Sequence, residues 1–469
     1  MFGNLFSLNF KVSGLICLLV INIAFVQAEI NLEQIKTDIE TLASDEMQGR
    51  KVFTPAIDKA ADYIAQRFEQ IGLEPFSGLS SFKQSFSIYQ ISPKTTSVEI
   101  NSEKIASEYV ASLTYHKSRS WNKPGDFNII FISENDDFRK IIGQVNQGNN
   151  DTLVLIDPKH KAKFARWQSF FSRLKSRLEV NTGPSLILVL KTEIDTFDIK
   201  TVKIHLTTST TRKSLTNVIG ILKGNNLKPV NSKISSKKNE NVIFSAHYDH
   251  LGVKEEDTSH IDKNNITEDK EVDLIFNGAD DDASGTTAVI ALAEHYATQS
   301  NRNRDLIFVA FTAEEIGGFG SQYFSKQINA DNIVAMINIE MIGKPSKFGT
   351  GEFWMTGFER SDLAHIINTN LEKSRFKMHQ DPYPKQQLFY RSDNATLARL
   401  GVPAHSFSAS QADTNLHYHK ASDEVKTLDI KSMVEVIKKL SIATKPLVMG
   451  SATPTRLDTT KVRKKGNFF

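Results

Sequence analysis

The segment NVIFSAH, residues 241–247, indicates the fold class. Apolar residues occupy both of its alternating faces, which is typical of a strand covered on both sides. Three further runs have this character, DLIFVAFT (305–312), IVAMINIE (333–340) and VPAHSFS (402–408), and helical patterns such as SGTTAVIALAEHYATQ (284–299) separate them. This alternation predicts an α/β domain whose mixed, largely parallel sheet has helices on both faces.

The rest of the chain divides where its pattern changes. Residues 31–90 have helical periodicity and join the α/β domain, which we assign to residues 29–91 and 211–448. Strand-like runs around a basic helical segment predict an inserted smaller lobe over residues 92–210. Residues 449–469 are predicted to form a flexible basic tail.

The N-terminus has the pattern of a secretory signal. Lys11 precedes the apolar run VSGLICLLVINIAFV, which is followed by Gln27 and the small residue Ala28. We expect a signal peptide over residues 1–28 and an exported protein, periplasmic or extracellular, with no stable membrane insertion after cleavage. An uncleaved anchor helix is the alternative. Cys17 is the only cysteine, so the mature chain would have neither disulfides nor thiolate metal ligands.

The composition excludes several classes of protein. Hydrophobic residues make up 40% and charged residues 24% of the 469 residues, as in ordinary globular proteins. The 57 basic and 54 acidic side chains give a net charge of only +3, so we expect no nucleic-acid partner. The sequence leaves the oligomeric state open.

Residues that bind metals or transfer protons follow the predicted strands at their carboxyl ends, the edge where parallel sheets bind ligands. They are His247, Asp249, His250, Asp280, Asp281, Asp282, Glu314, Glu315, Glu340, His417 and His419. Such groups would repel one another or stay unsatisfied unless a cation held them, so the pattern predicts a divalent metal site. Imidazole and carboxylate without sulfur suit zinc, while manganese and cobalt remain alternatives.

The segment NGADDDASG (277–285) places three aspartates in a row before a helical pattern. Alone, it could be a helix cap, an exposed acidic loop or a calcium site. Beside the other strand-end groups, we interpret it differently: the middle carboxylate, Asp281, can bridge two cations, while its neighbours cap, orient or accept hydrogen bonds.

Five motifs in order, SAHYDHLG, NGADDDASG, TAEEIGGFGS, NIEMIG and YHKASDE, resemble the M28 family of co-catalytic di-zinc aminopeptidases. LASDEMQGRKVFTP and AADYIAQRFEQIGLEPF resemble the helical N-terminal part of bacterial members. The likeness covers roughly residues 30–90 and 215–445, and the lobe between them weakly resembles a protease-associated insert. The resemblance implies a zinc exopeptidase-like fold, peptide substrates and two Zn²⁺ per chain.

The resemblance also implies a ligand set. His247 and Glu340 would hold one metal, Glu315 and His419 the other, and Asp281 would lie between them. Two more histidines remain alternative ligands: His250 and His417.

Three catalytic roles follow from the same resemblance. Glu314 would be the general base, Tyr418 would donate a hydrogen bond to the oxyanion, and Asp249 would orient the first metal-binding histidine. Two positions depart from the family pattern. Glu340 stands where Asp is more common, and Asn394 stands where His is common, which puts substrate contacts at that position in doubt.

These features together predict an exported zinc-dependent exopeptidase that removes N-terminal residues from peptides. A carboxypeptidase, or a glutaminyl cyclase with one zinc, would use the same scaffold. A non-catalytic binding ectodomain is a third hypothesis, although no ligand position or base is missing. The number of metals bound per chain distinguishes the cyclase from the di-zinc hydrolase.

Overall fold

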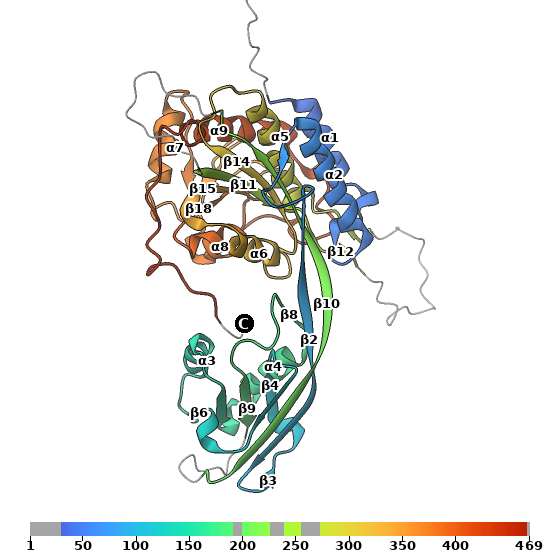
Figure 1. Ribbon diagram of the computed structural model, residues 1–469, viewed down its shortest axis with the longest axis vertical. Coiled ribbons are helices and arrows are strands. Elements are labelled where there is room, and N and C mark those ends of the chain that lie inside the picture. Colours follow the sequence, from blue (N-terminus) through green and yellow to red (C-terminus); the bar gives the residue numbers. More distant parts are fainter. Residues whose placement is uncertain (1–29, 191–198, 226–238, 255–272, 467–469) are drawn as a thin grey trace, which may run out of the picture.

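The computed structural model describes residues 30–190, 199–225, 239–254 and 273–466. The predicted signal peptide, residues 1–28, lies outside the described residues. A large mixed sheet with flanking helices forms the upper part of the molecule in Figure 1, and a long two-stranded ribbon connects it to a smaller lobe.

Four parallel strands form the centre of the large sheet, in the order β18 (Ala404–Ser408), β15 (Ile333–Ile339), β11 (Asn241–His247) and β14 (Asp305–Phe311). Nearly all of their residues are buried, as expected for strands covered on both faces. β10 (Val202–Leu222) pairs antiparallel with β14, so the sheet is mixed. The predicted fold class is confirmed.

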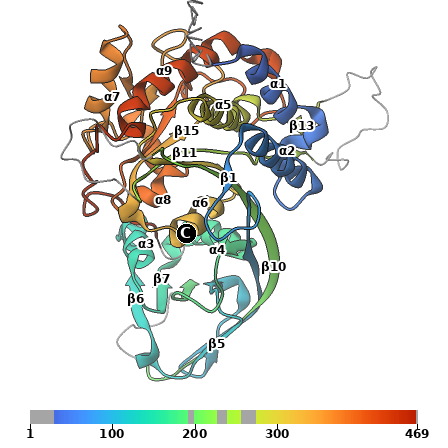
Figure 2. The ribbon, with the colours of Figure 1, turned by 45° about the horizontal axis from the view of Figure 1, so that its top comes forward.

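Helices cover both faces of this sheet (Figures 1 and 2). One face packs against α1 (Leu32–Leu42), α2 (Pro55–Ile71), α5 (Gly285–Ala297), α7 (Leu363–Glu372) and α9 (Ile430–Val448). The other face packs against the shorter helices α6 (Phe319–Gln327) and α8 (Asn394–Ala398).

The side chains of β11 alternate between the two faces of the sheet and so contribute to the hydrophobic core on each face. Val242 and Phe244 belong to the core under α5 and α9, while Ile243 belongs to the core under α6 and α8. The edge of the sheet beyond β18 is closed by β16 (Trp354–Met355) and β17 (His379–Gln380).

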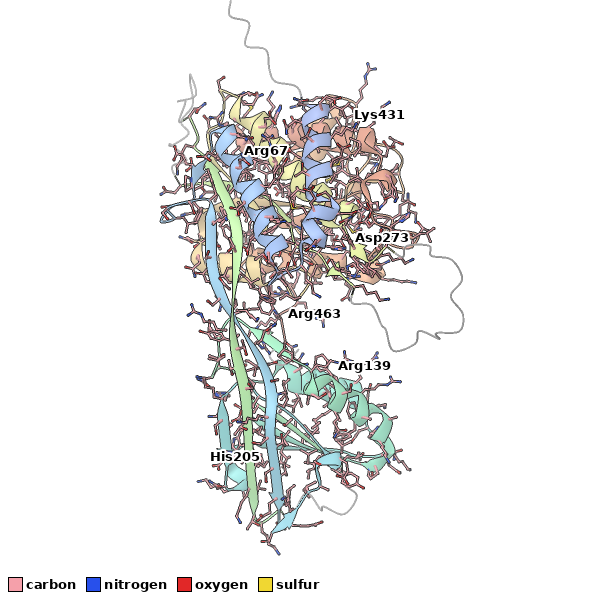
Figure 3. The ribbon with its side chains drawn as sticks, turned by 90° about the vertical axis from the view of Figure 1, so that its right-hand side faces the viewer. Arg67, Arg139, His205, Asp273, Lys431 and Arg463 are labelled. Carbon is pink, nitrogen blue, oxygen red and sulfur yellow. The ribbon has the colours of Figure 1, made fainter. Side chains whose placement is uncertain are left out.

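The ribbon consists of β2 (Lys83–Ile100) and β10, which pair antiparallel over most of their length. It runs from the large sheet to the far end of the molecule (Figure 3). The predicted lobe boundaries at residues 91/92 and 210/211 fall inside these two strands, so the large sheet continues without a break into the ribbon.

At the other end of the ribbon, a distal lobe contains a second sheet in the order β4 (Val110–Leu113), β9 (Leu186–Leu190), β7 (Thr152–Ile156) and β6 (Asn128–Ile132). One face of this sheet packs against two helices and the other against the ribbon. The helices are α3 (Phe138–Gln147) and α4 (Lys161–Ser172).

The remaining strands of the molecule are short. They are β1 (Glu74–Pro75), β3 (Glu103–Lys104), β5 (Ser118–Trp121), β8 (Lys175–Arg177), β12 (Gly252–Val253) and β13 (Ile275–Phe276).

The C-terminal segment differs from the flexible tail that we expected. Leu457 and Val462 are buried in the core beneath α8, and the Arg456 guanidinium donates hydrogen bonds to the carbonyls of Ala330 and Ile333. Arg463 follows on the path toward the distal lobe (Figure 3). These apolar contacts and hydrogen bonds anchor the segment on the sheet domain.

Among the helices of the described residues, none combines the length and the apolar character needed to cross a bilayer.

Candidate metal centre

The structure brings the five predicted ligands together at the carboxyl edge of the parallel strands. His247 ends β11, Glu315 and Glu340 follow β14 and β15, Asp281 lies in the loop before α5, and His419 lies in the loop after β18. The His247 Nε2 atom is 3.2 Å from Asp281 Oδ1 and 3.3 Å from Glu340 Oε1. On the other side, His419 Nε2 is 3.2 Å from Asp281 Oδ2 and 3.4 Å from Glu315 Oε2.

These separations suit tetrahedral metal coordination. Zinc–nitrogen and zinc–oxygen bonds of about 2.0–2.1 Å at a tetrahedral angle place neighbouring ligand atoms about 3.3 Å apart. The two carboxylate oxygens of Asp281 face different histidines, so two sets of ligand atoms share this one side chain. The arrangement can hold two cations with Asp281 as a bridge.

The charge balance of the cluster also fits a cation. Although burial opposes its ionisation, hydrogen bonds from His247 and His419 hold the pKa of the Asp281 carboxyl well below its usual range. In return, Asp281 and Glu315 raise the pKa of the His419 imidazole to about 10. Imidazole protons thus neutralise the carboxylates, and bound divalent ions would take their place.

The alternative ligand His250 has a different geometry. Its Nδ1 atom lies 2.7 Å from Glu315 Oε1, a direct hydrogen-bond distance and shorter than the separation of two ligands on one metal. His250 can also be grouped with Asp281 and Glu315 as a ligand set, but we favour His419 in that set because its distances match coordination. His250 then orients Glu315. His417 is half-buried, and its Nδ1 atom lies 3.0 Å from Ser422 Oγ.

The neighbours of Asp281 hold the loop in place. Asp282 Oδ1 accepts hydrogen bonds from the backbone amides of Gly285 (3.0 Å) and Met341 (2.9 Å), which connects the loop to α5 and to the end of β15. Asp280 Oδ1 accepts a hydrogen bond from the Gly343 amide at 2.8 Å. The peptide bond between Asp281 and Asp282 is cis. The three consecutive aspartates therefore divide into one shared carboxylate and two that accept hydrogen bonds from neighbouring backbone.

Asp423 is a site residue that the sequence reasoning missed. Its Oδ2 atom accepts hydrogen bonds from the amides of Asp280 (3.0 Å) and Asp281 (3.1 Å), and its Oδ1 atom is 2.8 Å from Lys344 Nζ. Asp423 thus fixes the backbone beneath the shared carboxylate. The sequence feature that could have identified Asp423 is its position in the motif YHKASDE, four residues after His419.

Arg50 is the second missed residue, and it lies beneath two ligand loops. Its guanidinium is fully buried and donates hydrogen bonds to four carbonyls: Leu42 (2.6 Å), Tyr248 (2.8 Å), Asn277 (2.6 Å) and Gly278 (3.0 Å). Burial lowers its pKa to about 10, so it is still charged at neutral pH. Arg50 joins the N-terminal helices to the loops that follow His247 and precede Asp281.

Asp249 acts differently from the prediction. Its carboxylate oxygen is 3.9 Å from His247 Nδ1, beyond hydrogen-bond distance, and its backbone carbonyl lies 3.1 Å from that nitrogen instead. The carboxylate accepts hydrogen bonds from the amides of Glu314 (3.0 Å) and Glu315 (3.4 Å). The Asp249 side chain therefore positions the loop that carries the predicted base.

Glu314 and Tyr418 border the candidate metal centre. Burial, reinforced by the negative charge of Glu340, raises the pKa of the Glu314 carboxyl well above its ordinary value. The Tyr418 ring stacks on the imidazole of His419, with ring centres 3.9 Å apart. Tyr418 and Glu340 both line a cavity of about 170 Å³ beside the site.

Asn394, at the departure from the family pattern, is fully buried and does not line this cavity. Its amide nitrogen donates hydrogen bonds to the carbonyls of Phe389 and Ala404, and its oxygen accepts one from Ser406 Oγ. In this chain it fixes the start of α8 against β18.

In this chain, imidazoles and carboxylates cluster at the strand ends of an α/β sheet domain. Its class is therefore that of α/β proteins with a candidate co-catalytic metal centre. Residues 217–442 match the model of Peptidase family M28, and they include all five predicted ligands. Over these residues the chain is similar to this peptidase family.

Two curated relatives show how far the likeness extends. The chain is 32% identical over 177 residues to a probable leucine aminopeptidase of Arthroderma benhamiae, a match covering 34% of this chain and 45% of that protein. It is 25% identical over 191 residues to a vacuolar membrane protease of Schizosaccharomyces pombe, covering 40% and 21%. The match therefore spans less than half the length of these relatives.

Solved structures resemble this chain over more of its length than the curated relatives do. An aminopeptidase from Aneurinibacillus sp. strain AM-1 superimposes with a TM-score of 0.51 at 16% identity, covering 94% of this chain and 98% of that one. The zinc aminopeptidase BSAP from Bacillus subtilis gives the same values. These structures share the fold of this chain.

Proposed function

We propose that this protein is a zinc-dependent exopeptidase that removes N-terminal residues from peptides. The observation that carries the proposal is the Asp281 carboxylate, whose two oxygens serve two separate sets of ligand atoms. The match of residues 217–442 to a peptidase family supports peptide substrates. The aminopeptidase names of relatives support action at the N-terminus.

In this proposal, His247 and Glu340 would hold one Zn²⁺, His419 and Glu315 would hold the other, and Asp281 would contribute to both. When bound, two such ions would supply Lewis-acid chemistry, lowering the pKa of a water and polarising the scissile carbonyl. The remaining chemistry is that of this chain's own residues.

Glu314 is the proton carrier in this scheme. Its carboxylate takes the proton of the attacking water, and the resulting carboxylic acid passes that proton to the departing amine. The Tyr418 hydroxyl donates a hydrogen bond to the oxyanion of the tetrahedral intermediate. Asp249 holds the amide of Glu314 and thereby the position of the base.

Removal of metal provides the first test. Dialysis against a chelator should abolish hydrolysis of aminoacyl p-nitroanilides, because no other described group at the site lowers the pKa of water. Zinc should restore activity in proportion to occupancy, and elemental analysis should give two ions per chain. Full activity in the metal-free protein would contradict the proposal. One ion per chain without hydrolysis of these substrates would favour a glutaminyl cyclase.

Tyr418→Phe tests the oxyanion role. We expect kcat to fall by about 10- to 100-fold with little change in KM, because only an interaction made in the transition state is lost. Phenylalanine keeps the stacking on His419, so the number of bound metals should stay the same. An unchanged kcat would remove Tyr418 from the mechanism.

Export stays a prediction. We expect the mature protein to begin at Glu29, which N-terminal sequencing of the secreted or periplasmic protein would check.

A further inference from the structure

The cavity beside the candidate metal centre is lined by both polar and apolar side chains. Side chains at alternate positions face the same way along a strand, so Ser406 and Ser408 of β18 line one wall, continued by Ser410. Trp354 of β16 is fixed there by a hydrogen bond from its indole nitrogen to the Ser410 carbonyl at 3.2 Å. A water needs only about 10–15 Å³ of such space, so a cavity of about 170 Å³ can hold a side chain of several heavy atoms.

Two charged residues are found among those that line this cavity, Glu340 and Arg391. Arg391 follows the turn Leu388–Tyr390, and its backbone amide bonds to the Leu388 carbonyl at 3.0 Å. Arg391 is exposed to solvent as well as lining the cavity. Within the described parts of the chain, its guanidinium makes neither an ion pair nor a hydrogen bond.

Glu340 does not neutralise Arg391. The Glu340 carboxylate lies 3.3 Å from His247 Nε2 through one oxygen and accepts a hydrogen bond from Ser392 Oγ at the other. It therefore belongs to the candidate metal centre, and the guanidinium of Arg391 is left without a counter-charge in the cavity. A five-donor planar cation of this kind matches a carboxylate group well.

We propose that Arg391 makes this cavity a binding site for an acidic side chain, so that the protein prefers peptides whose N-terminal residue is glutamate or aspartate. The inference rests on the proposed function, because it takes the cavity beside the metal centre to receive the side chain of the residue to be released. The bound carboxylate supplies the missing counter-charge. The serine side chains of β18 are small, so they leave room for the acidic side chain of the substrate.

The test compares glutamyl and glutaminyl p-nitroanilides, since these substrates have nearly the same shape and differ in charge. In the unmodified protein, kcat/KM for the glutamyl substrate should exceed that for the glutaminyl substrate by about tenfold, the effect of one charge-assisted hydrogen-bonded contact. Arg391→Gln should bring this ratio close to one. Arg391→Lys should give an intermediate ratio, because it keeps the charge and loses the planar fork.

Arg139→Gln is the matched control, since it removes the same charge from the surface of α3 in the distal lobe (Figure 3), and it should keep the ratio of the unmodified protein. A ratio near one in the unmodified protein, with hydrolysis of both substrates, would overturn the inference and leave the proposed function standing. Equal losses on both substrates in Arg391→Gln would also overturn it. No hydrolysis of glutamyl, glutaminyl or leucyl substrates by the zinc-loaded protein would instead contradict the proposed function.

Discussion

Glu314→Gln should lower kcat by about a thousandfold while both metals stay bound. Glutamine has nearly the size of glutamate, so the loop held by Asp249 can keep its hydrogen bonds to the backbone. The amide cannot accept the proton of the attacking water or return it to the departing amine. The loss should therefore appear in kcat, with a smaller change in KM.

The control for this experiment is Glu372→Gln, an exposed change at the end of α7 that should leave activity and metal content unaltered. Elemental analysis of the Glu314 variant is essential, because a loss of metal would lower kcat for a different reason. A variant that keeps both ions and more than about a tenth of the original kcat would show that another group transfers the proton.

Arg50→Met should give the largest loss of stability. The substitution leaves four buried carbonyls without their donor, two of them at Asn277 and Gly278 beside the shared aspartate. We expect the free energy of unfolding of the sheet domain to fall by about 4 kcal/mol, measured as a lower midpoint in thermal unfolding. Metal affinity should fall as well, because the loops on either side of the centre lose their common support.

Two further variants separate the charge of Arg50 from its geometry. Arg50→Lys keeps a cation but reaches fewer carbonyls, so its midpoint should lie between those of the methionine variant and the unmodified protein. Arg139→Met removes an exposed arginine from the distal lobe and should shift the midpoint little. A methionine variant as stable as the unmodified protein would mean that the four hydrogen bonds contribute little to folding.

The sheet could be predicted because its strands are buried on both faces and therefore appear as continuous apolar runs. The convergence of the ligands followed from the same pattern, since His247 and Glu340 stand at the ends of parallel neighbours. Their roles as metal ligands stay proposals that the distances support.

Other residues were missed because their partners are backbone groups brought together only by folding. Arg50 contacts carbonyls up to 228 positions away, and Asp423 contacts amides 142 and 143 positions away. Nothing in local periodicity predicts such contacts. The anchoring of Leu457 depends in the same way on a surface beneath α8 that a sequence of mostly polar residues does not indicate.

Anomalous scattering from a zinc-loaded crystal, measured at the zinc absorption edge, shows whether two cations share the Asp281 carboxylate. We expect two peaks, one next to His247 and Glu340 and the other next to His419 and Glu315, with one Asp281 oxygen bound to each. A single peak at full occupancy, or two peaks of which neither contacts Asp281, would contradict this expectation.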